Sequence, residues 1–396
     1  MEKEKLNIGL FIDTFFPMID GVINVVDNYA KRLSKVANVT VFTLNPRGKC
    51  DRTYPYKVVQ CKKMIIPGLD YDLPLPKIDR KFKKALKESN LDIIHIHSPF
   101  TIGRMGAAFG KKHNIPVIAT MHSQFKQDFK KATKSEFISK LLLKNIAKTF
   151  NMADVLWTMN PACVELSREY GYKGKTDIIP NGTDLKNEFL DEEILTYKNE
   201  IRKKFNIGED EKIFMNIGRL NKLKNIDFVI DVCKKLQQSN FKFKLLLIGS
   251  GKDEEHFKNK VKSLQLTQNV IFLGKVFDAK EKSKLFASAD LQVFPSYYDT
   301  DGIVRIEAAA FKTPTIFIEN SIAASAITNN VNGYIGKNDI DKFAEKIVDI
   351  FENDELYQKV KIKCFEDLYK DWDKIVEIVL EKYYRIKNKG EENWKI

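Results

Sequence analysis

Short segments made almost entirely of apolar residues recur along this chain, and a longer stretch of helical character separates each from the next. Strands that are apolar throughout and alternate with helices are typical of a parallel sheet that helices cover on both faces. Pro180-Asn181-Gly182 interrupts the alternation, which then begins again. The pattern predicts an α/β chain of two doubly wound domains, with ligands at the carboxyl ends of the strands and a cleft between the domains. The expected strands lie at 7–12, 38–43, 56–60, 92–96, 115–120, 154–158, 176–179, 212–217, 243–248, 269–273, 290–294 and 315–318.

The chain has 396 residues, which is enough for two domains with full-sized cores. We expect the first domain over residues 1–185 and the second over residues 186–371. The stretches between the strands predict helices at about 23–36, 77–89, 102–113, 135–150, 160–169, 225–237, 253–263, 279–287, 303–310 and 341–352, with one or two more up to residue 396.

Composition narrows the class of protein. The five cysteines are scattered and have no CxxC spacing, which argues against a disulfide framework and a zinc site and suits a reducing cytoplasm. No apolar run approaches the ~18 residues of a membrane-spanning helix, and the N-terminus enters a strand without a signal peptide, so we expect a cytoplasmic protein. The net charge of +13 is compatible with nucleic acid, an anionic membrane surface or an anionic substrate, and also with lysine-rich codon usage alone.

One stretch, residues 291–318, combines the features of a substrate site. It predicts a buried strand, a polar loop up to Gly302 and a helix over 303–310. The N–H groups of Gly302, Ile303 and Val304 have no acceptor within that helix. Together with the positive end of the helix dipole they form a site for an anion such as a diphosphate.

Two carboxylates accompany that anion site. Asp299 lies in the loop, and Glu307 lies one turn or more inside the helix. Carboxylates do not bind phosphate, but they accept strong hydrogen bonds from hydroxyl groups. The stretch therefore favours a nucleotide sugar, with one acid on the sugar and the other on the ribose. An ordinary βα unit with a solvated acidic loop has the same pattern.

Two glycine-containing turns follow strands of the second domain. Gly218-Arg219-Leu220 precedes Lys224 where a strand ends and a helix begins. Arg219 and Lys224 could together neutralise a diphosphate leaving group, and solvated loop side chains are the alternative. Gly249-Ser250-Gly251 is a tight strand-to-helix turn, which we attribute mainly to backbone geometry.

Three histidines lie on or after strands of the first domain. His122 follows the strand at 115–120 and is expected to face the cleft, the alternative being a structural histidine bonded to a neighbouring loop. His95 and His97 alternate along the strand at 92–96, and we expect one to point to each face of the sheet. No other candidate ligand is close to them in sequence, so no metal site is predicted.

The segment 125–150 is strongly basic, with seven lysines against Asp128 and Glu136. A basic amphipathic helix can lie on an anionic leaflet and gains ~1 kcal/mol per lysine near the surface. The alternative is that its apolar face packs on the domain's own sheet and its lysines are solvated. The apolar residues expected at helical spacing on one side are Phe137, Ile138, Leu141, Leu142, Ile146 and Phe150.

Several weak motifs occur in a specific order. They are DTFFP followed by DGV (13–22), HIHSPF (95–100), ATMHS (119–123), PNGTD (180–184), GRLNKLKN (218–225), IGSG (248–251) and DTDGIVRIEAAAFKTP (299–314). In this combination the chain resembles, over nearly its whole length, the family-4 retaining glycosyltransferases of the GT-B fold. The resemblance implies two Rossmann-like domains facing across a cleft, with the donor in the C-terminal domain and the acceptor in the N-terminal one. It also implies that the final segment, 372–396, packs back on the first domain.

The resemblance assigns roles by position. Arg219 and Lys224 would bind the donor diphosphate, Glu307 the ribose hydroxyls, and His122 the sugar near its 6-hydroxyl. Asp299 stands where the family usually has glutamate and would contact the donor sugar. The implied catalytic set is His122, Asp299, Glu307, Arg219 and Lys224. The implied donor-binding positions are Gly21, Gly218, Arg219, Lys224, Gly249, Val276, Gly302, Ile303, Val304 and Glu307.

The shorter side chain of Asp299 leaves Asp301, two residues later, as an alternative contact for the donor sugar. The resemblance implies that the product keeps the donor's anomeric configuration, because the acceptor attacks from the same face and the leaving phosphate takes its proton. The resemblance therefore implies neither a metal nor another cofactor. Closure of the two domains would exclude water.

The function expected from the whole sequence is transfer of a hexose, glucose or galactose, from a nucleotide sugar such as a UDP-sugar to a membrane lipid or lipid-linked cell-envelope acceptor. The protein would be cytoplasmic and peripheral at the inner membrane face, held there through Lys126–Lys148. A glycosyltransferase with a soluble sugar or protein acceptor is one alternative. A basic nucleic-acid-binding protein is another, but no nucleic-acid-binding motif supports it and we expect no such partner.

Overall fold

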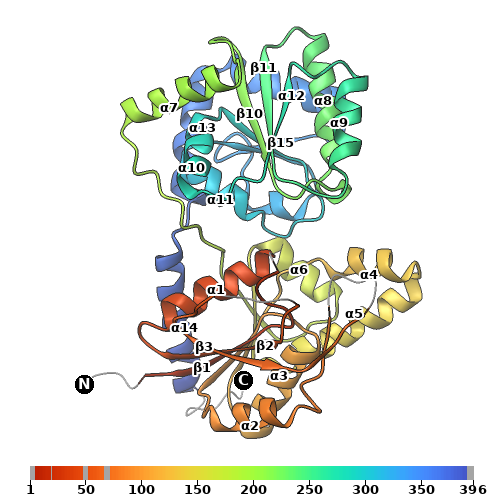
Figure 1. Ribbon diagram of the computed structural model, residues 1–396, viewed down its shortest axis with the longest axis vertical. Coiled ribbons are helices and arrows are strands. Elements are labelled where there is room, and N and C mark those ends of the chain that lie inside the picture. Colours follow the sequence, from red (N-terminus) through yellow and green to blue (C-terminus); the bar gives the residue numbers. More distant parts are fainter. Residues whose placement is uncertain (1–4, 19, 48–51, 67–71, 390–396) are drawn as a thin grey trace. The chain divides into compact units, whose positions relative to one another are not determined.

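The computed structural model describes residues 5–18, 20–47, 52–66 and 72–389. The chain forms two compact units, each built on its own parallel sheet (Figure 1). Unit 1 consists of Met1–Asn181 and Trp372–Ile396, and unit 2 of Gly182–Asp371.

Unit 1 contains a seven-stranded sheet in the order β3-β2-β1-β6-β7-β8-β9, in which every neighbouring pair is parallel. Strands β6, β7 and β8 are buried at every position, and β2 is buried at every position after its first residue. Burial on both sides explains why these strands are apolar on both faces. The strands of this sheet are β1 (Asn7–Phe11), β2 (Asn38–Leu44), β3 (Lys57–Cys61), β6 (Ile93–Ile96), β7 (Val117–Thr120), β8 (Val155–Thr158) and β9 (Lys175–Ile178).

Helices cover this sheet and connect its strands. They are α1 (Gly21–Leu33), α2 (Arg80–Glu88), α3 (Thr101–His113), α4 (Phe125–Thr133), α5 (Glu136–Phe150), α6 (Pro161–Glu169) and α14 (Trp372–Lys389). A short antiparallel pair, β4 (Lys63–Met64) and β5 (Leu73–Pro74), lies outside the main sheet.

The C-terminal helix α14 belongs to unit 1 although the whole of unit 2 precedes it in the chain. It packs against α1, where Arg32 Nε lies 2.6 Å from Asp373 Oδ1. Its Tyr383 is fully buried, and its ring stacks on Trp157 at a centroid distance of 5.6 Å. Contacts from a helix this far along the chain therefore help to form the core of the first unit.

Unit 2 contains a six-stranded sheet in the order β12-β11-β10-β13-β14-β15, again with every neighbouring pair parallel. Its strands are β10 (Lys212–Ile217), β11 (Phe243–Ile248), β12 (Val270–Gly274), β13 (Leu291–Phe294), β14 (Thr315–Ile318) and β15 (Tyr334–Gly336). Its helices are α7 (Asp191–Lys204), α8 (Ile226–Gln238), α9 (Glu254–Ser263), α10 (Ala279–Ser288), α11 (Ile303–Ala310), α12 (Ile340–Glu352) and α13 (Asp354–Leu368), with 3₁₀ turns η1 (Lys222–Lys224) and η2 (Ile322–Ala326).

The basic segment 125–150 contains one helix more than was predicted. It forms two helices, α4 and α5, because Lys134 adopts a left-handed conformation (φ 51°) and Ser135 caps the second helix. The two helices pack on each other as a pair within unit 1 (Figure 1). The helix predicted at 135–150 is confirmed as α5, whereas α4 was not predicted.

The apolar residues of α5 were expected to share one face, but they do not. Ile146 and Phe150 are buried, whereas 79% of Phe137 and 59% of Leu141 are exposed, and Ile138 is exposed as well. Residues four apart on a helix lie on the same side, so Phe137 and Leu141 share the outward face of α5. The lysines on that outward side are Lys140, Lys144 and Lys148, all exposed. Apolar and basic groups are therefore mixed on one exposed surface. We call the exposed residues of α4, of α5 and of the turn between them the α4–α5 face. In the described part of the chain, no helix is long and apolar enough to cross a membrane.

Candidate active site

The predicted donor-binding residues of unit 2 lie in the loops that follow four neighbouring strands. Arg219 follows β10, Gly249 follows β11, Val276 follows β12, and Asp299 follows β13. These strands are adjacent and parallel, so the loops after them meet at the carboxyl edge of the sheet. Residues that are far apart in the sequence are thereby placed along one edge.

Two glycines allow the loops after β10 and β11 to approach each other closely. A Cβ on Gly249 (φ 134°) would lie 1.8 Å from the carbonyl oxygen of Gly218. A Cβ on Gly251 would lie 2.1 Å from the carbonyl oxygen of Leu220. Across the same contact, the Leu220 N–H donates to the Ser250 carbonyl at 3.0 Å. The expected backbone role of this turn is confirmed, and it holds the loop that carries Arg219, whose own side chain is exposed.

Lys224 lies at the end of η1, and its ammonium group reaches into the loop after β13. Its Nζ lies 2.6 and 2.7 Å from the two carboxylate oxygens of Asp299. Beside it, the Asn225 side-chain amide donates to the Pro295 carbonyl at 3.2 Å, which fastens the two loops together. Lys224, predicted to bind the diphosphate, and Asp299, predicted to bind the sugar, are therefore paired with each other in the structure.

Glu307 lies in the second turn of α11, and its carboxylate meets a lysine of the preceding helix. Lys282 Nζ on α10 is 2.6 Å from Glu307 Oε1. The other oxygen, Oε2, is buried and has no hydrogen-bond partner among the described residues. The carboxylate thus has one oxygen satisfied by the protein and one that is not.

The N-terminus of α11 has the predicted form. Gly302 precedes the helix in a left-handed conformation (φ 67°), and no side chain caps the helix there. The amides of Gly302, Ile303 and Val304 come before the first acceptor inside the helix, as an anion site requires.

Asp301, which the sequence suggested as an alternative contact for the donor sugar, is buried in an ion pair. Its side chain is only 3% exposed, and Oδ1 accepts a hydrogen bond of 2.5 Å from Arg305 Nη2 one turn further along. This buried ion pair joins the loop before α11 to the helix and leaves the Asp301 carboxylate little exposed surface for a ligand.

In unit 1, His122 follows β7 and lies beside His97, which follows β6. His122 Nε2 is 3.1 Å from His97 Nδ1, so one ring donates to the other. His97 and His95 point to the same side of the strand, with ring centroids 4.0 Å apart. The expectation of opposite faces was wrong, because residues two apart on a strand share a face.

Burial keeps this histidine cluster neutral. Desolvation lowers the pKa of His95 and of His97 well below the usual range, and the neighbouring histidines add to the effect. Desolvation lowers the pKa of the partly exposed His122 as well. His95 is held on both sides, by Tyr383 Oη of α14 at 2.6 Å and by Thr120 Oγ1 at 2.7 Å.

Gly21, the remaining predicted donor residue, is the first residue of α1. The Asp20 carboxylate caps this helix by accepting a hydrogen bond of 2.9 Å from the Val22 N–H. A Cβ on Gly21 would meet no atom of the described residues within 4 Å. The N-terminus of α3 in the same unit is already filled, since Asp13 accepts from the Ile102 N–H at 2.7 Å.

Comparison with known proteins identifies the family of this chain. Residues 19–187 match the sequence family described as Glycosyltransferase Family 4, and residues 197–364 match the family described as Glycosyl transferases group 1. The chain belongs to the family-4 glycosyltransferases. Each family match covers most of one unit, and together they cover the residues assigned above.

Individual relatives of this glycosyltransferase are distant but cover most of its length. Alpha-monoglucosyldiacylglycerol synthase of Streptococcus pneumoniae is 27% identical over 85% of this chain and 76% of its own. N-acetyl-alpha-D-glucosaminyl L-malate synthase of Bacillus anthracis is 24% identical over 96% of this chain and 97% of its own. The crystal structure of HepE from Anabaena, in complex with UDP and glucose, superimposes with a TM-score of 0.74 at 16% identity, covering 96% of this chain and 99% of that one. This structural similarity establishes the GT-B fold.

The structure of this glycosyltransferase also contains contacts that sequence reasoning missed. Neither Lys282 as the partner of Glu307 nor His97 as the partner of His122 was anticipated. The second contact could have been found, because β6 and β7 are consecutive parallel strands and His97 and His122 both follow their last residues. No comparable signal points to Lys282, which is one of many lysines on helices.

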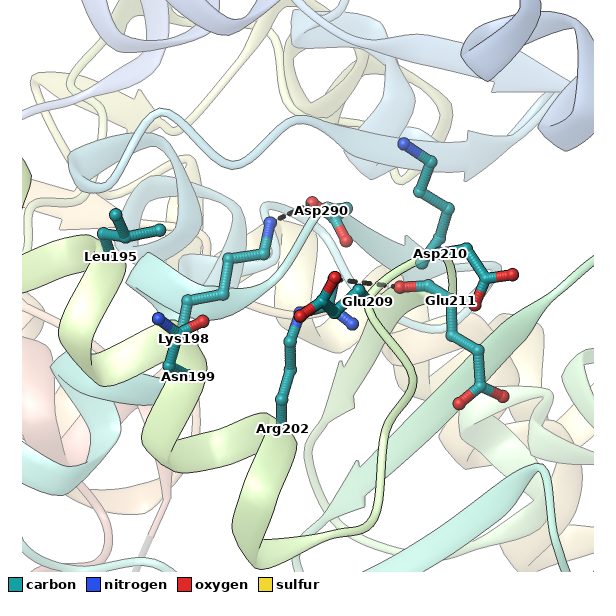
Figure 2. Close-up of a pocket in the computed structure, with 9 residues that line it drawn as sticks. Leu195, Lys198, Asn199, Arg202, Glu209, Asp210, Glu211 and Asp290 are labelled. Atoms are coloured by element: carbon teal, nitrogen blue, oxygen red, sulfur yellow. Dashed lines mark hydrogen bonds and ion pairs between the residues drawn. The ribbon is translucent and has the colours of Figure 1, made fainter.

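A pocket of about 390 Å³ lies away from these residues, at the amino ends of β10 and β13 (Figure 2). Two of the charged groups that line it, Lys198 and Asp290, are paired with each other. Lys198 Nζ of α7 is 2.6 Å from Asp290 Oδ1, and Asp290 Oδ2 accepts from the Ile213 N–H at 2.8 Å. These contacts attach α7 to the sheet. Among the described residues, no three His, Cys, Asp or Glu side chains are grouped so that they could hold a metal ion.

Proposed function

We propose that this glycosyltransferase transfers a hexose, glucose or galactose, from a UDP-sugar to a membrane lipid or a lipid-linked acceptor of the cell envelope. One observation supports the donor part of this proposal. Lys224, the uncapped N-terminus of α11 and the Glu307 carboxylate, which has one oxygen without a hydrogen-bond partner among the described residues, lie along one edge of the sheet. The named activity of the Streptococcus pneumoniae relative supports the acceptor half, and the UDP and glucose bound by the Anabaena protein support the donor.

The donor chemistry follows from charge. As the bond to the sugar breaks, negative charge grows on the departing diphosphate, and Arg219, Lys224 and the amides at the start of α11 stabilise it most strongly at that point. Glu307 accepts hydrogen bonds from the ribose, and Asp299 from the sugar. We propose that the acceptor attacks on the face that the leaving group departs from, so that the product retains the donor's configuration. No metal is required, so EDTA should leave the rate unchanged.

The acceptor half rests on the α4–α5 face. Phe137 and Leu141 expose large apolar side chains to solvent beside the lysines of the same helix. Such a mixed surface is disfavoured in water but suits the headgroup region of an anionic leaflet, where the lysines meet phosphates and the apolar groups reach the acyl boundary. We propose that the protein is peripheral at the cytoplasmic face of the membrane and docks through this surface.

The activity is tested by offering UDP-glucose, UDP-galactose, GDP-mannose and ADP-glucose to the purified enzyme with vesicles that contain diacylglycerol. We expect a glycolipid from one UDP-sugar, with the anomeric configuration of the donor as determined by NMR. A product of inverted configuration would contradict the mechanism, and no product with any lipid would contradict the acceptor class.

A soluble acceptor is the second candidate, because the Bacillus anthracis relative is named for transfer to L-malate. The same donors are therefore offered with L-malate and with simple sugars in the absence of vesicles. Transfer to a soluble acceptor at the rate seen with lipid would favour this candidate.

Membrane docking is tested by vesicle flotation. Changing Lys130, Lys134 and Lys144, all exposed, to Glu should cost roughly 3 kcal/mol or more of binding to phosphatidylglycerol vesicles, an affinity loss of about 100-fold. The matched control makes the same charge change on exposed lysines of unit 2, namely Lys203, Lys262 and Lys280. Equal losses in both variants would show that net charge, and not the α4–α5 face, determines binding.

The apolar part of the same face has its own test. Phe137→Ser with Leu141→Ser removes exposed groups, so the fold should keep its melting temperature while vesicle binding weakens. Unchanged binding would show that only charge contributes.

A further inference from the structure

The ion pair between Lys282 and Glu307 connects two helices of unit 2 at the donor edge of the sheet. Lys282 lies in the first turns of α10, and Glu307 lies in α11. Their side chains are 22% and 13% exposed, and Nζ and Oε1 are 2.6 Å apart. The pair is therefore largely removed from solvent, whereas most lysine–carboxylate pairs in the described part of the protein are more exposed.

The two oxygens of the Glu307 carboxylate have different surroundings. Oε1 receives the ammonium of Lys282, and Oε2 is buried without a hydrogen-bond partner among the described residues. An unsatisfied oxygen of a buried carboxylate is costly, and most such groups in native proteins have a partner. A ligand hydroxyl that donates to Oε2 would remove this cost, so the protein already presents an acceptor for it.

The position of the pair suggests which ligand supplies that hydroxyl. Glu307 is four residues beyond Ile303, the first residue of α11, whose N-terminal amides form the anion site. A nucleoside diphosphate bound with its phosphates at that terminus carries ribose hydroxyls next to its α-phosphate. A carboxylate at this distance along the helix is suited to these hydroxyls.

We propose that Lys282 is a positioning residue for the donor nucleotide: by binding Glu307 Oε1 it directs Oε2 to accept a hydrogen bond from a ribose hydroxyl. This inference rests on the proposed use of a UDP-sugar donor. Lys282 needs no direct contact with the nucleotide, because its ammonium selects which oxygen remains available and keeps the carboxylate from turning toward another donor.

The test compares UDP with 2′,3′-dideoxy-UDP, which lacks both ribose hydroxyls, by isothermal titration calorimetry. The wild type should bind UDP about tenfold or more tightly than the dideoxy analogue, as expected for a hydrogen bond to a charged group. In Lys282→Met this preference should fall below about threefold, because Oε2 is no longer directed. Lys282→Arg, which can still donate to Oε1, should keep the preference.

The control is Lys284→Met on the same helix. Lys284 pairs with Glu200 of α7 at 3.2 Å, so its loss removes an equal charge and a similar helix contact away from Glu307. It should leave the preference for UDP over the analogue unchanged. Melting temperatures of all variants identify any that fail to fold, and Lys282→Arg remains informative if Lys282→Met is among them.

Two outcomes separate the inference from the function on which it rests. If the wild type binds neither UDP nor another nucleoside diphosphate, the proposed donor is wrong. If the wild type prefers UDP but Lys282→Met loses affinity equally for UDP and for the analogue, Lys282 contributes only general charge or helix packing, and the inference is overturned.

Discussion

Replacing Asp299 with asparagine should have opposite effects on the two halves of the donor. In the structure the Asp299 carboxylate forms an ion pair with Lys224, and its two oxygens lie 2.6 and 2.7 Å from Lys224 Nζ. A diphosphate that binds Lys224 must therefore displace or tolerate a neighbouring negative charge. The asparagine side chain keeps the size of the aspartate and removes that charge.

The size of the effect follows from distance and exposure. Two like charges about 4 Å apart repel by ~1 kcal/mol in water and by ~4 kcal/mol at the effective dielectric of a protein surface. The two side chains are only 18% and 19% exposed, so solvent screens the repulsion in part and its size lies between these two limits. A gain of ~1–2 kcal/mol would tighten UDP binding by about 5- to 30-fold.

UDP-glucose should gain less than UDP. The sugar loses the charge-assisted hydrogen bond that we assign to Asp299, which is stronger than the neutral one available from asparagine. We expect the affinity for UDP-glucose to change by less than about threefold and kcat to fall, because the contact with the sugar is weakened as it reacts. Calorimetry with both ligands and a transfer assay measure the three quantities.

A control and a refuting result complete the experiment. Asp341→Asn removes one negative charge from a pair with Lys235 on the surface of the same unit, and it should leave UDP binding unchanged. If Asp299→Asn folds normally and binds UDP no more tightly than the wild type, Asp299 does not compete for Lys224 and the reasoning fails.

Two further predictions concern packing and pH. Gly251→Ala places a Cβ 2.1 Å from the Leu220 carbonyl oxygen, so the loop must shift. We expect the free energy of unfolding, measured with denaturant, to fall by ~1–3 kcal/mol and UDP binding to weaken. A variant that binds UDP as tightly as the wild type would contradict this. The lowered pKa values of His95 and His97 mean that the unfolded chain binds more protons than the folded one below pH ~6.5, so the stability of unit 1 should fall as pH drops from 7 to 5. Fluorescence of the buried Trp157 during urea unfolding measures this, and a flat pH dependence would argue against neutral buried histidines.

The fold could be predicted from sequence because its strands are buried on both sides. A segment such as 243–248 is apolar at almost every position, and β11 spans those residues. Only Lys244 interrupts the run, and its ammonium leaves the interior to reach the Gln268 carbonyl at 2.6 Å. Helix ends were less certain: α1 begins at Gly21 and not near Ile23, because the Asp20 side chain caps it.

The site was predictable wherever chain position determines placement. Arg219 and Asp299 follow neighbouring parallel strands, so their loops must meet. Side-chain pairing between helices was not predictable, since α10 offers several lysines and nothing local distinguishes Lys282. The burial of Phe137 was also misjudged: regular spacing indicates a helix, but it does not say how wide a stripe the rest of the domain covers.

The distribution of charge leads to a final prediction about salt. At the donor edge the lysines are paired with acids in partly buried surroundings, as Lys224 is with Asp299. On the α4–α5 face, Lys140 has only a 3.5 Å contact with Glu136, in which both side chains are about 70% exposed, and such a pair contributes little. Salt screens exposed charges over a Debye length of about 8–10 Å but acts much less on buried ones.

Raising NaCl from ~0.05 to ~0.5 M should therefore release the protein from anionic vesicles while weakening UDP binding far less. Vesicle flotation and calorimetry across the same salt series measure the two effects. Parallel losses would mean that the donor site depends on the same exposed charge, and would contradict the separation of a membrane surface in unit 1 from an ion-paired donor site in unit 2.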